Sequence, residues 1–292
     1  MDDKIKYLWD LYHFLVKNVI SAHEFKESIE KLCGLLISEE PYIKIKTSEV
    51  LVVGDVHGDF NSHLLTALET VKSGGCVVFL GDYIDRGSNS IEVLCWLFQF
   101  KLFFPKDVFL LSGNHESVHC GSCTFPEEIT SKYSEKDYDL ETKIYDLFNF
   151  LGAAAEIHIG RKTLLVCHAC PISNMIECND RIEFENNINS EMKKPHDRVS
   201  NFFWDDISED VEEIQTSHRG DLYKIYPIRI MKDYLKKFGY SYIIRGHDHS
   251  AQKIIKKNIL ASIATPIVCP HDLEAGIWRF KKNSKPEFIY NN

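Results

Sequence analysis

The sequence predicts an α/β fold that forms a single domain over residues 1–292. Beyond Pro41, short apolar runs alternate with longer amphipathic stretches, which is the pattern of strands that alternate with helices. Toward the C-terminus, strand-like pieces follow one another directly, so we expect mixed sheets. A chain of this length can bury a large core, and no linker or low-complexity tract divides it.

Residues 1–40 predict a hairpin of two helices that packs on the rest of the domain. Ser21 and Glu24 form the capping-box signature S-x-x-E, which marks the start of the second helix. Each helix carries an apolar stripe at helical spacing. The stripes consist of Leu8, Leu11, Tyr12, Leu15 and Val19 in the first helix and Phe25, Ile29, Leu32 and Leu36 in the second.

The remaining elements alternate along the chain. The polar, pattern-poor stretch 117–139 predicts a surface loop. Helical periodicity falls at 60–72, 90–103, 141–150 and 227–238. Apolar runs predict buried strands at "EVLVV" (49–53), "CVVFL" (76–80), "DVFLLS" (107–112), "TLLVC" (163–167) and "SYIIR" (241–245), and "KIIKK", "ILASIA", "AGIWRF" and "EFIY" predict later strands.

Each of the five buried runs ends in polar side chains that have no packing reason to be there. In open α/β sheets, ligands bind at the carboxyl ends of the strands, so we expect these side chains to meet at one edge. Asp55 and His57 follow the first run, Asp82 the second, Asn114 with His115 and Glu116 the third, His168 the fourth, and His247 with Asp248 the fifth.

The donor types at these strand ends predict a two-metal site. Two Asp, one Asn and three His, with no thiolate among them, suit Mn, Fe or Zn. Six ligands exceed the four of one tetrahedral zinc ion, so we expect two divalent or trivalent ions that share a bridging carboxylate, roughly 3.5–4 Å apart. Such a pair acidifies a bridging water and clamps both oxygens of a phosphoryl displacement. We interpret His63, His158, His196 and His249 as surface or internally satisfied residues.

Composition limits the partners and the compartment. A formal net charge of −9 with interspersed signs provides no basic patch for nucleic acid. No apolar run approaches the roughly 20 residues that span a bilayer, and the N-terminus has the pattern of neither a signal nor a transit peptide. Nine cysteines, an odd number at irregular spacing, argue against a disulfide framework. We therefore expect a cytoplasmic or nuclear protein that binds neither nucleic acid nor membrane.

The motifs "GDVHG", "GDYIDRG" and "GNHE", then a His after a strand and "RGH", resemble in that order the phosphoprotein phosphatases. These metal-dependent serine/threonine phosphatases include calcineurin and the type 1 and type 2A enzymes. The resemblance extends from about Leu32 to Phe280. It implies the calcineurin-like metallophosphoesterase fold, with two mixed sheets packed as a sandwich and flanked by helices. It also implies phosphoserine and phosphothreonine protein substrates, which a regulatory subunit often selects.

The resemblance implies a role for each matching residue. His115 would be the general acid that protonates the leaving alkoxide, and Asp85 would orient it. Arg86, Arg219 and Asn114 would bind the phosphate. The nucleophile would be a hydroxide held by both metals, Mn or an Fe/Zn pair, and no phosphoenzyme would form. Asp55 and His57 would bind one ion, Asp82 would bridge, and Asn114, His168 and His247 would bind the other.

Four departures from the family pattern indicate a divergent member. "HAC" places Ala169 and Cys170 where the family has two glycines, and "RGHD" replaces "RAHQ". "TPIVCP" has Ile267 and Val268 where the family has an Asn-Tyr pair that touches substrates and toxin inhibitors, which predicts reduced toxin sensitivity. "SVHCGSC" replaces the usual small residues after "GNHE".

Two further functions share the same motifs. Diadenosine tetraphosphatases carry these metal motifs, and "HAC" is closer to their His-Ala pattern, but the C-terminal "ASIATP" and "EAGIWRF" resemble the protein phosphatases. A non-catalytic phosphopeptide-binding protein would keep the fold without turnover. The intact set of expected catalytic positions favours a phosphatase over that alternative.

Overall fold

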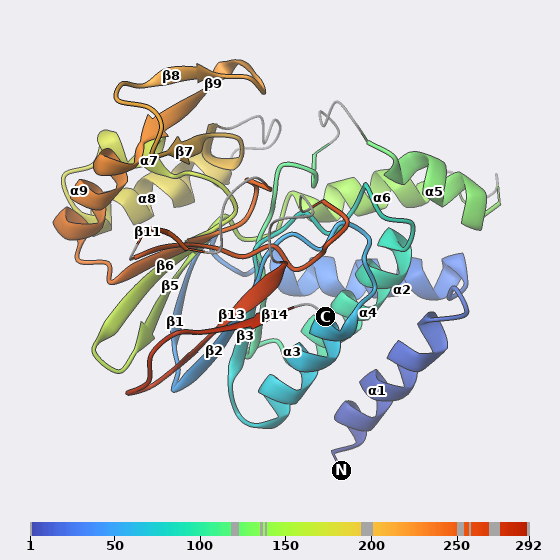
Figure 1. The fold of residues 1–292 in the computed structure, drawn as a ribbon. Coiled ribbons are helices and arrows are strands. Elements are labelled where there is room, and N and C mark those ends of the chain that lie inside the picture. Colours follow the sequence, from blue (N-terminus) through green and yellow to red (C-terminus); the bar gives the residue numbers. More distant parts are fainter. Residues whose placement is uncertain are drawn as a thin grey trace.

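Two β-sheets packed face to face form the centre of the molecule (Figure 1). The computed structural model describes residues 2–117, 123–134, 137, 139–193, 201–249, 254–256, 258–268 and 275–290. The five-stranded sheet has the order β14 (Glu287–Tyr290), β13 (Gly276–Lys281), β2 (Glu49–Val53), β3 (Cys76–Phe79) and β4 (Val108–Leu110).

The six-stranded sheet is mixed, as predicted. Its β5 and β6 pair antiparallel, whereas β6 pairs parallel with β10. Its order is β1 (Tyr42–Lys46), β5 (Ala154–Ile159), β6 (Lys162–Cys167), β10 (Tyr242–Arg245), β12 (Ile259–Ala261) and β11 (Ile254–Lys256). A small third sheet, which the sequence did not predict, has the order β7 (Asp206–Ser208), β9 (Gly220–Pro227) and β8 (Gln215–Ser217).

The apolar run of β2 is uninterrupted because both faces of the strand are buried. Val50 and Val52 pack into the core between the two sheets, against Ile157 of β5. Leu51 and Val53 face the helices on the outside. Burial on both sides is the reason that central parallel strands lack the polar alternation of a half-exposed strand.

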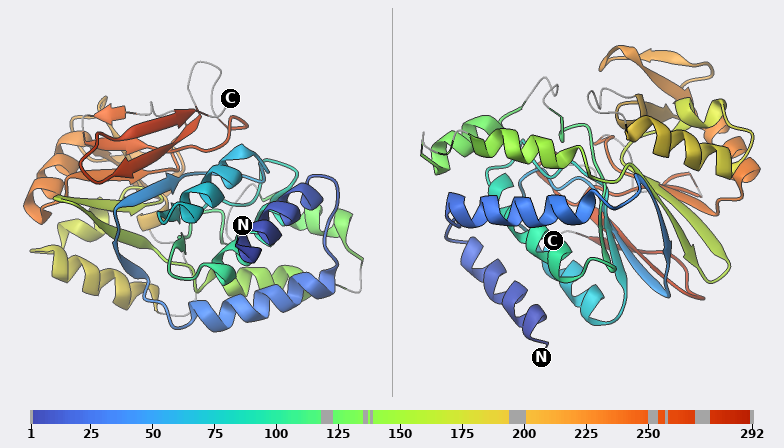
Figure 2. Two further views of the ribbon diagram at one scale, coloured as in Figure 1. Left: turned by 90° about the horizontal axis from the view of Figure 1, so that it is seen from below. Right: turned by 180° about the vertical axis from the view of Figure 1, so that it is seen from behind.

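Helices cover the outer face of each sheet (Figure 2). On the five-stranded sheet lie α3 (Ser62–Lys72) and α4 (Ser90–Phe103). The other four helices on this side pack against these two or against one another: α1 (Asp3–Leu15), α2 (Ala22–Leu36), α5 (Phe125–Lys132) and α6 (Asp139–Phe148). The six-stranded sheet is covered by α7 (Ile172–Ile176), α8 (Arg181–Met192) and α9 (Ile228–Phe238). The short 3-10 helix η2 (Asn201–Phe203) lies on the same side. Among the described residues, no helix is both long enough and apolar enough to cross a membrane.

The predicted N-terminal helices form and pack on α4. The Ser21 hydroxyl accepts from Glu24 N–H, and the Glu24 carboxylate accepts from Ser21 N–H, so the capping box is confirmed. Trp96 of α4 donates its indole N–H to the carbonyl of Leu8 at 3.0 Å, which attaches α1 to α4.

The predicted loop 117–139 is wrong in part, because α5 occupies the middle of it. Only Phe125 and Ile129 of this helix are buried, and two apolar residues are too few for a recognisable period. The part of "SVHCGSC" at 118–122 lies outside the described residues. The sequence pattern also did not predict β1, β5, α7 and α8.

Candidate metal centre

The polar side chains after the buried strands meet where the two sheets adjoin. Asp55 and Asp82 follow β2 and β3 of the five-stranded sheet, whereas His168 and His247 follow β6 and β10 of the six-stranded sheet. The expectation of one sheet edge is therefore corrected, because the edge combines strand ends from two sheets. The contact is direct: His168 Nε2 lies 3.4 Å from Asp82 Oδ1.

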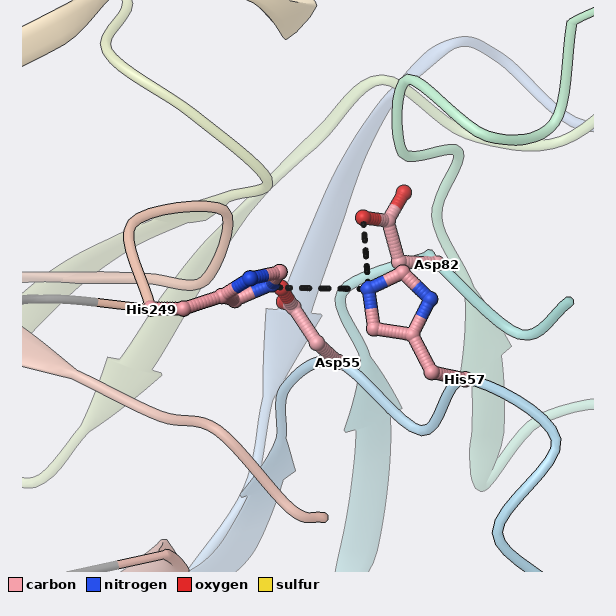
Figure 3. A group of neighbouring side chains, drawn as sticks. All are labelled: Asp55, His57, Asp82 and His249. Carbon is pink, nitrogen blue, oxygen red and sulfur yellow. Dashed lines mark hydrogen bonds and ion pairs between the residues drawn. The ribbon is translucent and has the colours of Figure 1, made fainter. Parts of the chain in front are cut away.

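The first donor group consists of Asp55, His57, Asp82 and His249, whose ligand atoms all lie within 4.8 Å of one another (Figure 3). His57 Nε2 is 3.4 Å from Asp82 Oδ2 and 4.0 Å from Asp55 Oδ2. His249 Nε2 is 2.9 Å from Asp55 Oδ2. Three of the four residues are fully buried, so their donor atoms face one another and not bulk water.

The second donor group consists of Asp82, His168 and His247, again within 4.8 Å. Asn114 joins it, because its Oδ1 lies 2.9 Å from His168 Nε2 and 2.8 Å from His247 Nδ1. Asp82 is common to both groups. Its Oδ2 faces His57 and its Oδ1 faces His168, so this carboxylate is placed to serve a cation in either group.

The donor atoms fit cations. His57 Nε2 is buried and has no hydrogen-bond partner among the described residues. Its Nδ1 lies 2.9 Å from the carbonyl of Ile84, and His168 Nδ1 lies 3.1 Å from that of Leu80, contacts that leave the Nε2 lone pairs for a ligand. Burial lowers the pKa of His57 to about 3 and that of His168 to about 4, so both imidazoles are neutral donors at pH 7.

The two central carboxylates respond differently to burial. Burial raises the pKa of Asp82 well above its ordinary value, and a cation bound beside the carboxylate would favour its charged form. Burial alone would also raise the pKa of Asp55. The hydrogen bond from His249 and the neighbouring His168 and His57 outweigh burial there and lower that pKa. Asp55 is therefore the better anion of the pair.

The backbone around the site is strained where the predicted residues lie. Gly81 and Gly113 permit a close crossing of two loops, because a Cβ on Gly81 would fall 2.0 Å from Gly113 N. Five non-glycine site residues adopt left-handed φ angles, which surrounding contacts must maintain. They are His57 (46°), Asp82 (52°), Asp85 (68°), Arg86 (69°) and His247 (68°).

Glu116 supports this crossing, although the sequence analysis gave it no role. Its buried carboxylate accepts from the backbone N–H groups of Asp82 at 2.7 Å, Tyr83 at 2.8 Å and Gly113 at 2.7 Å. One side chain thus holds the two loops that carry Asp82 and Asn114. The "GNHE" motif contains a signal for it, since Glu116 follows the donor residue by two positions.

His115 and Asp85 form a buried pair next to the donor groups. His115 Nδ1 lies 2.6 Å from Asp85 Oδ2. The other oxygen of Asp85 accepts from Thr124 N–H at 2.7 Å and Phe125 N–H at 2.9 Å, at the start of α5. Burial alone would raise the pKa of Asp85, but the hydrogen bond and charge of His115, followed by the two backbone hydrogen bonds, outweigh burial and lower it, so Asp85 stays ionised beside the imidazole.

The two predicted arginines lie at the edge of the site. Arg86 is exposed and directly follows Asp85, and its backbone N–H donates to Thr124 Oγ1 at 3.2 Å. Arg219 is half-buried at the β8–β9 turn. Its Nε donates to Asp206 Oδ2 at 2.9 Å and its NH2 group to the carbonyl of His247 at 3.3 Å. Asp206, which the sequence analysis missed, thereby fixes Arg219 next to His247.

The interpretation of His249 as a surface or internally satisfied residue did not include its place in the first donor group. Its ring lies 5.3 Å from that of His57, and its Nε2 contacts Asp55. The signal was present in "HDH", which places a second His two positions after His247 at the end of a buried strand. His63 and His158 lie outside both donor groups, and His196 lies outside the described residues.

The departures from the family pattern have local structural counterparts. Ala169 and Cys170 are fully buried, and Cys170 belongs to the apolar core on the outer side of the six-stranded sheet. Asp248 accepts from the buried Arg245 at 3.1 Å and is thus tied into the turn that carries both His247 and His249. Ile267 is 50% exposed, which leaves an apolar side chain on the surface after β12.

Comparison with known proteins places these motifs in a family context. A family model of the calcineurin-like phosphoesterases matches residues 48–251. Among curated proteins, the chain is 33% identical to the PP2A-like serine/threonine-protein phosphatase PPG1 of Candida albicans, over 66% of this chain and 46% of that protein. It thus spans less than half of that relative. It is 32% identical to a catalytic subunit of protein phosphatase 2A from Dictyostelium discoideum, over 78% of this chain and 71% of that protein.

A solved structure shares the fold. It is a protein serine/threonine phosphatase from Saccharomyces cerevisiae with similarity to human phosphatase PP5. The superposition has a TM-score of 0.74 and covers 96% of this chain and 93% of that chain, at 21% sequence identity. At this identity the likeness concerns the fold alone, and it agrees with the sandwich of two mixed sheets.

Proposed function

Because the chain belongs to the calcineurin-like phosphoesterase family, we propose that it is a metal-dependent serine/threonine protein phosphatase. One observation carries the proposal: Asp82 joins two donor groups directly beside the His115–Asp85 pair. Hydrolysis of a phosphomonoester requires donors for two cations, a proton donor and groups that bind the phosphate. This site has the donors, a histidine and two arginines next to one another. Phosphoserine and phosphothreonine proteins are the proposed substrates.

The metal ions would be held by the two donor groups. Asp55, His57 and His249 would bind one ion, Asn114, His168 and His247 the other, and Asp82 both. When bound, the ions supply an acidified water and positive charge beside the phosphate. Mn, or Fe with Zn, suits these oxygen and nitrogen donors.

The phosphate would be bound by Arg86 and Arg219. A guanidinium fork matches the geometry and charge of a phosphomonoester dianion. Asp206 and the carbonyl of His247 occupy the Nε and one NH2 donor of Arg219, which leaves further N–H groups for the substrate. Arg86 is exposed and so is accessible to an incoming phosphoprotein.

The leaving group would receive its proton from His115. A serine or threonine alkoxide has a high pKa, so its departure at neutral pH requires a proton donor. Asp85 contacts Nδ1 of His115 and so orients the ring, and Nε2 would be the atom that protonates the leaving oxygen. The ionised Asp85 also stabilises the positive charge of the imidazolium.

A substrate panel tests the proposal. Purified chain loaded with Mn²⁺ should release phosphate from 4-nitrophenyl phosphate and from phosphoserine and phosphothreonine peptides. Diadenosine tetraphosphate should be the poorer substrate. Asp82→Asn should lower kcat/KM by on the order of 10³-fold or more, since it removes the shared ligand. Preference for the dinucleotide would assign the nucleotide hydrolase instead, and phosphopeptide binding without turnover would assign a non-catalytic binding protein.

A further inference from the structure

The loop that carries Asp85 and Arg86 is held from outside by α5. The N-terminal N–H groups of α5 bind Asp85, and Thr124 Oγ1 accepts from Arg86 N–H. Both Asp85 and Arg86 have left-handed φ angles, 68° and 69°. Non-glycine residues keep such angles only where neighbouring contacts impose them. The position of Arg86 therefore depends on what holds the loop.

Glu128 of α5 holds the far end of the same loop. Its carboxylate accepts from Ser90 N–H at 3.1 Å and Ile91 N–H at 3.0 Å, through a different oxygen in each case. These groups open α4, whose own N-cap residue Asn89 makes no side-chain capping bond. The start of α4 is thus capped by a carboxylate from another helix, which satisfies N–H groups that have no acceptor within α4 and complements the helix dipole.

Lys132, one turn further along α5, links the loop to both Glu128 and α4. Its ammonium group donates to the carbonyl of Ser88 at 2.8 Å, within the loop itself. It also binds Glu128 at 2.9 Å and Glu92 of α4 at 2.6 Å. The side chains of Glu128 and Glu92 are only 9% and 7% exposed, so water screens this ion-pair network less than a surface pair.

We propose that Glu128 and Lys132 are positioning residues for Arg86. The inference rests on the proposed function, since it concerns the phosphate-binding role of Arg86. Thr124, Glu128 and Lys132 contact the loop at residues 85, 86, 88, 90 and 91, on both sides of Gly87. Loss of this support lets the loop relax from its left-handed angles. The guanidinium then leaves the place where it meets phosphate.

The first experiment measures how well the Glu128→Gln variant recognises phosphate, separately from how well it folds. Glu128→Gln should lower kcat/KM for 4-nitrophenyl phosphate by on the order of tenfold, because a displacement of about 1 Å at a binding group has effects of this size or larger. The competitive inhibition constant of inorganic phosphate should rise by a similar factor. The Mn²⁺ content should stay as in the wild type, because Glu128 lies outside both donor groups.

A double-mutant cycle with Arg86 distinguishes positioning from general stability. In the Arg86→Ala background, Glu128→Gln should not lower kcat/KM further, although it lowers the thermal midpoint as before. The matched control is Lys101→Met at the other end of α4, where the ammonium group binds Glu39 at 2.6 Å. The control should lower the thermal midpoint and leave kcat/KM and phosphate inhibition unchanged.

Two results overturn the inference. One is that Glu128→Gln lowers kcat/KM equally with and without Arg86, and the other is that Glu128→Gln has wild-type kinetics. If Glu128→Gln does not fold, Lys132→Met is judged by the same criteria, since it keeps the carboxylate cap. If the wild type hydrolyses no phosphoester, the proposed function fails, and calorimetry of inorganic phosphate with the Mn²⁺-loaded chain then decides. If Glu128→Gln binds inorganic phosphate more weakly than the wild type, the inference is supported. If the two bind phosphate equally, or if the wild type binds none, the inference is overturned.

Discussion

Asp82 is the side chain on which both donor groups depend. Its two oxygens face different histidines, and Oδ1 also accepts from His115 N–H at 3.0 Å. Its left-handed φ angle and the hydrogen bond from its N–H to Glu116 fix the carboxylate between the two groups. A single residue therefore connects the predicted metals to the predicted proton donor.

The first prediction concerns His249. His249→Ala should lower the affinity for one of two Mn²⁺ ions by roughly 10–100-fold, because the first donor group loses a nitrogen beside Asp55. Equilibrium dialysis with elemental analysis gives the two affinities.

The control for this prediction is His23→Ala, which removes an exposed imidazole on α2. It should leave both affinities unchanged. Two unchanged Mn²⁺ affinities in His249→Ala would show that His249 only donates a hydrogen bond to Asp55.

At the scale of elements, the parallel strands explain why the ligands are spaced so widely in the sequence. β2, β3 and β4 are parallel neighbours, so the residues that follow them emerge on one side of the sheet. Each strand needs a helical return before the next one can begin. Between β2 and β3 the return is α3, and between β3 and β4 it is α4, the helix on which α1 and α2 pack.

The capping box of α2 supplies a prediction at this scale. Ser21→Ala should lower the free energy of unfolding by about 1 kcal/mol, because the Glu24 N–H loses its hydroxyl acceptor at the helix start. Chemical denaturation of the full chain measures the change.

Ser38→Ala is the matched control just beyond the other end of α2. Ser38 is exposed, and its hydroxyl donates to the carbonyl of Leu35, which water can replace as a partner. The change should stay within about 0.5 kcal/mol. Equal losses in the two variants would contradict a specific role for the capping box.

At the scale of the whole molecule, the site connects the two sheets. Asp55, His57 and Asn114 come from strand ends of the five-stranded sheet, and His168 and His247 from those of the six-stranded sheet. Ions bound to both sets would cross-link the two halves of the sandwich. Such ions bind the folded chain and not the unfolded one, so they add directly to stability.

Metal removal should therefore lower the thermal midpoint. At a free Mn²⁺ concentration 100 times Kd, each bound ion adds about 2.7 kcal/mol, which corresponds to a midpoint higher by roughly 4 °C per ion for a chain of 292 residues. Chelation should reverse the shift, and added Mn²⁺ should restore it. The Asp82→Asn variant should show a much smaller shift. An identical midpoint with and without Mn²⁺ in the wild type would refute metal cross-linking of the sheets.

Local patterns were sufficient to predict most elements. A helix was predicted near residues 90–103, and the structure has Ser90–Phe103. The capping box at Ser21 and the apolar run of β2 were equally clear, because neighbouring residues alone determine them. α5 was missed, since its role lies in contacts made by Glu128 and Lys132 with another helix and not in an apolar stripe.

The sequence by itself determined which residue types end the buried strands, and hence the donor set and the family, because each motif spans only a few adjacent positions. Only the tertiary structure decided which strands are neighbours, that two sheets supply the ligands, and that His249 belongs with Asp55. Asp55 and His249 are 194 positions apart, yet their side chains are 2.9 Å apart. The packing of the two sheets sets that distance, and no local period encodes it.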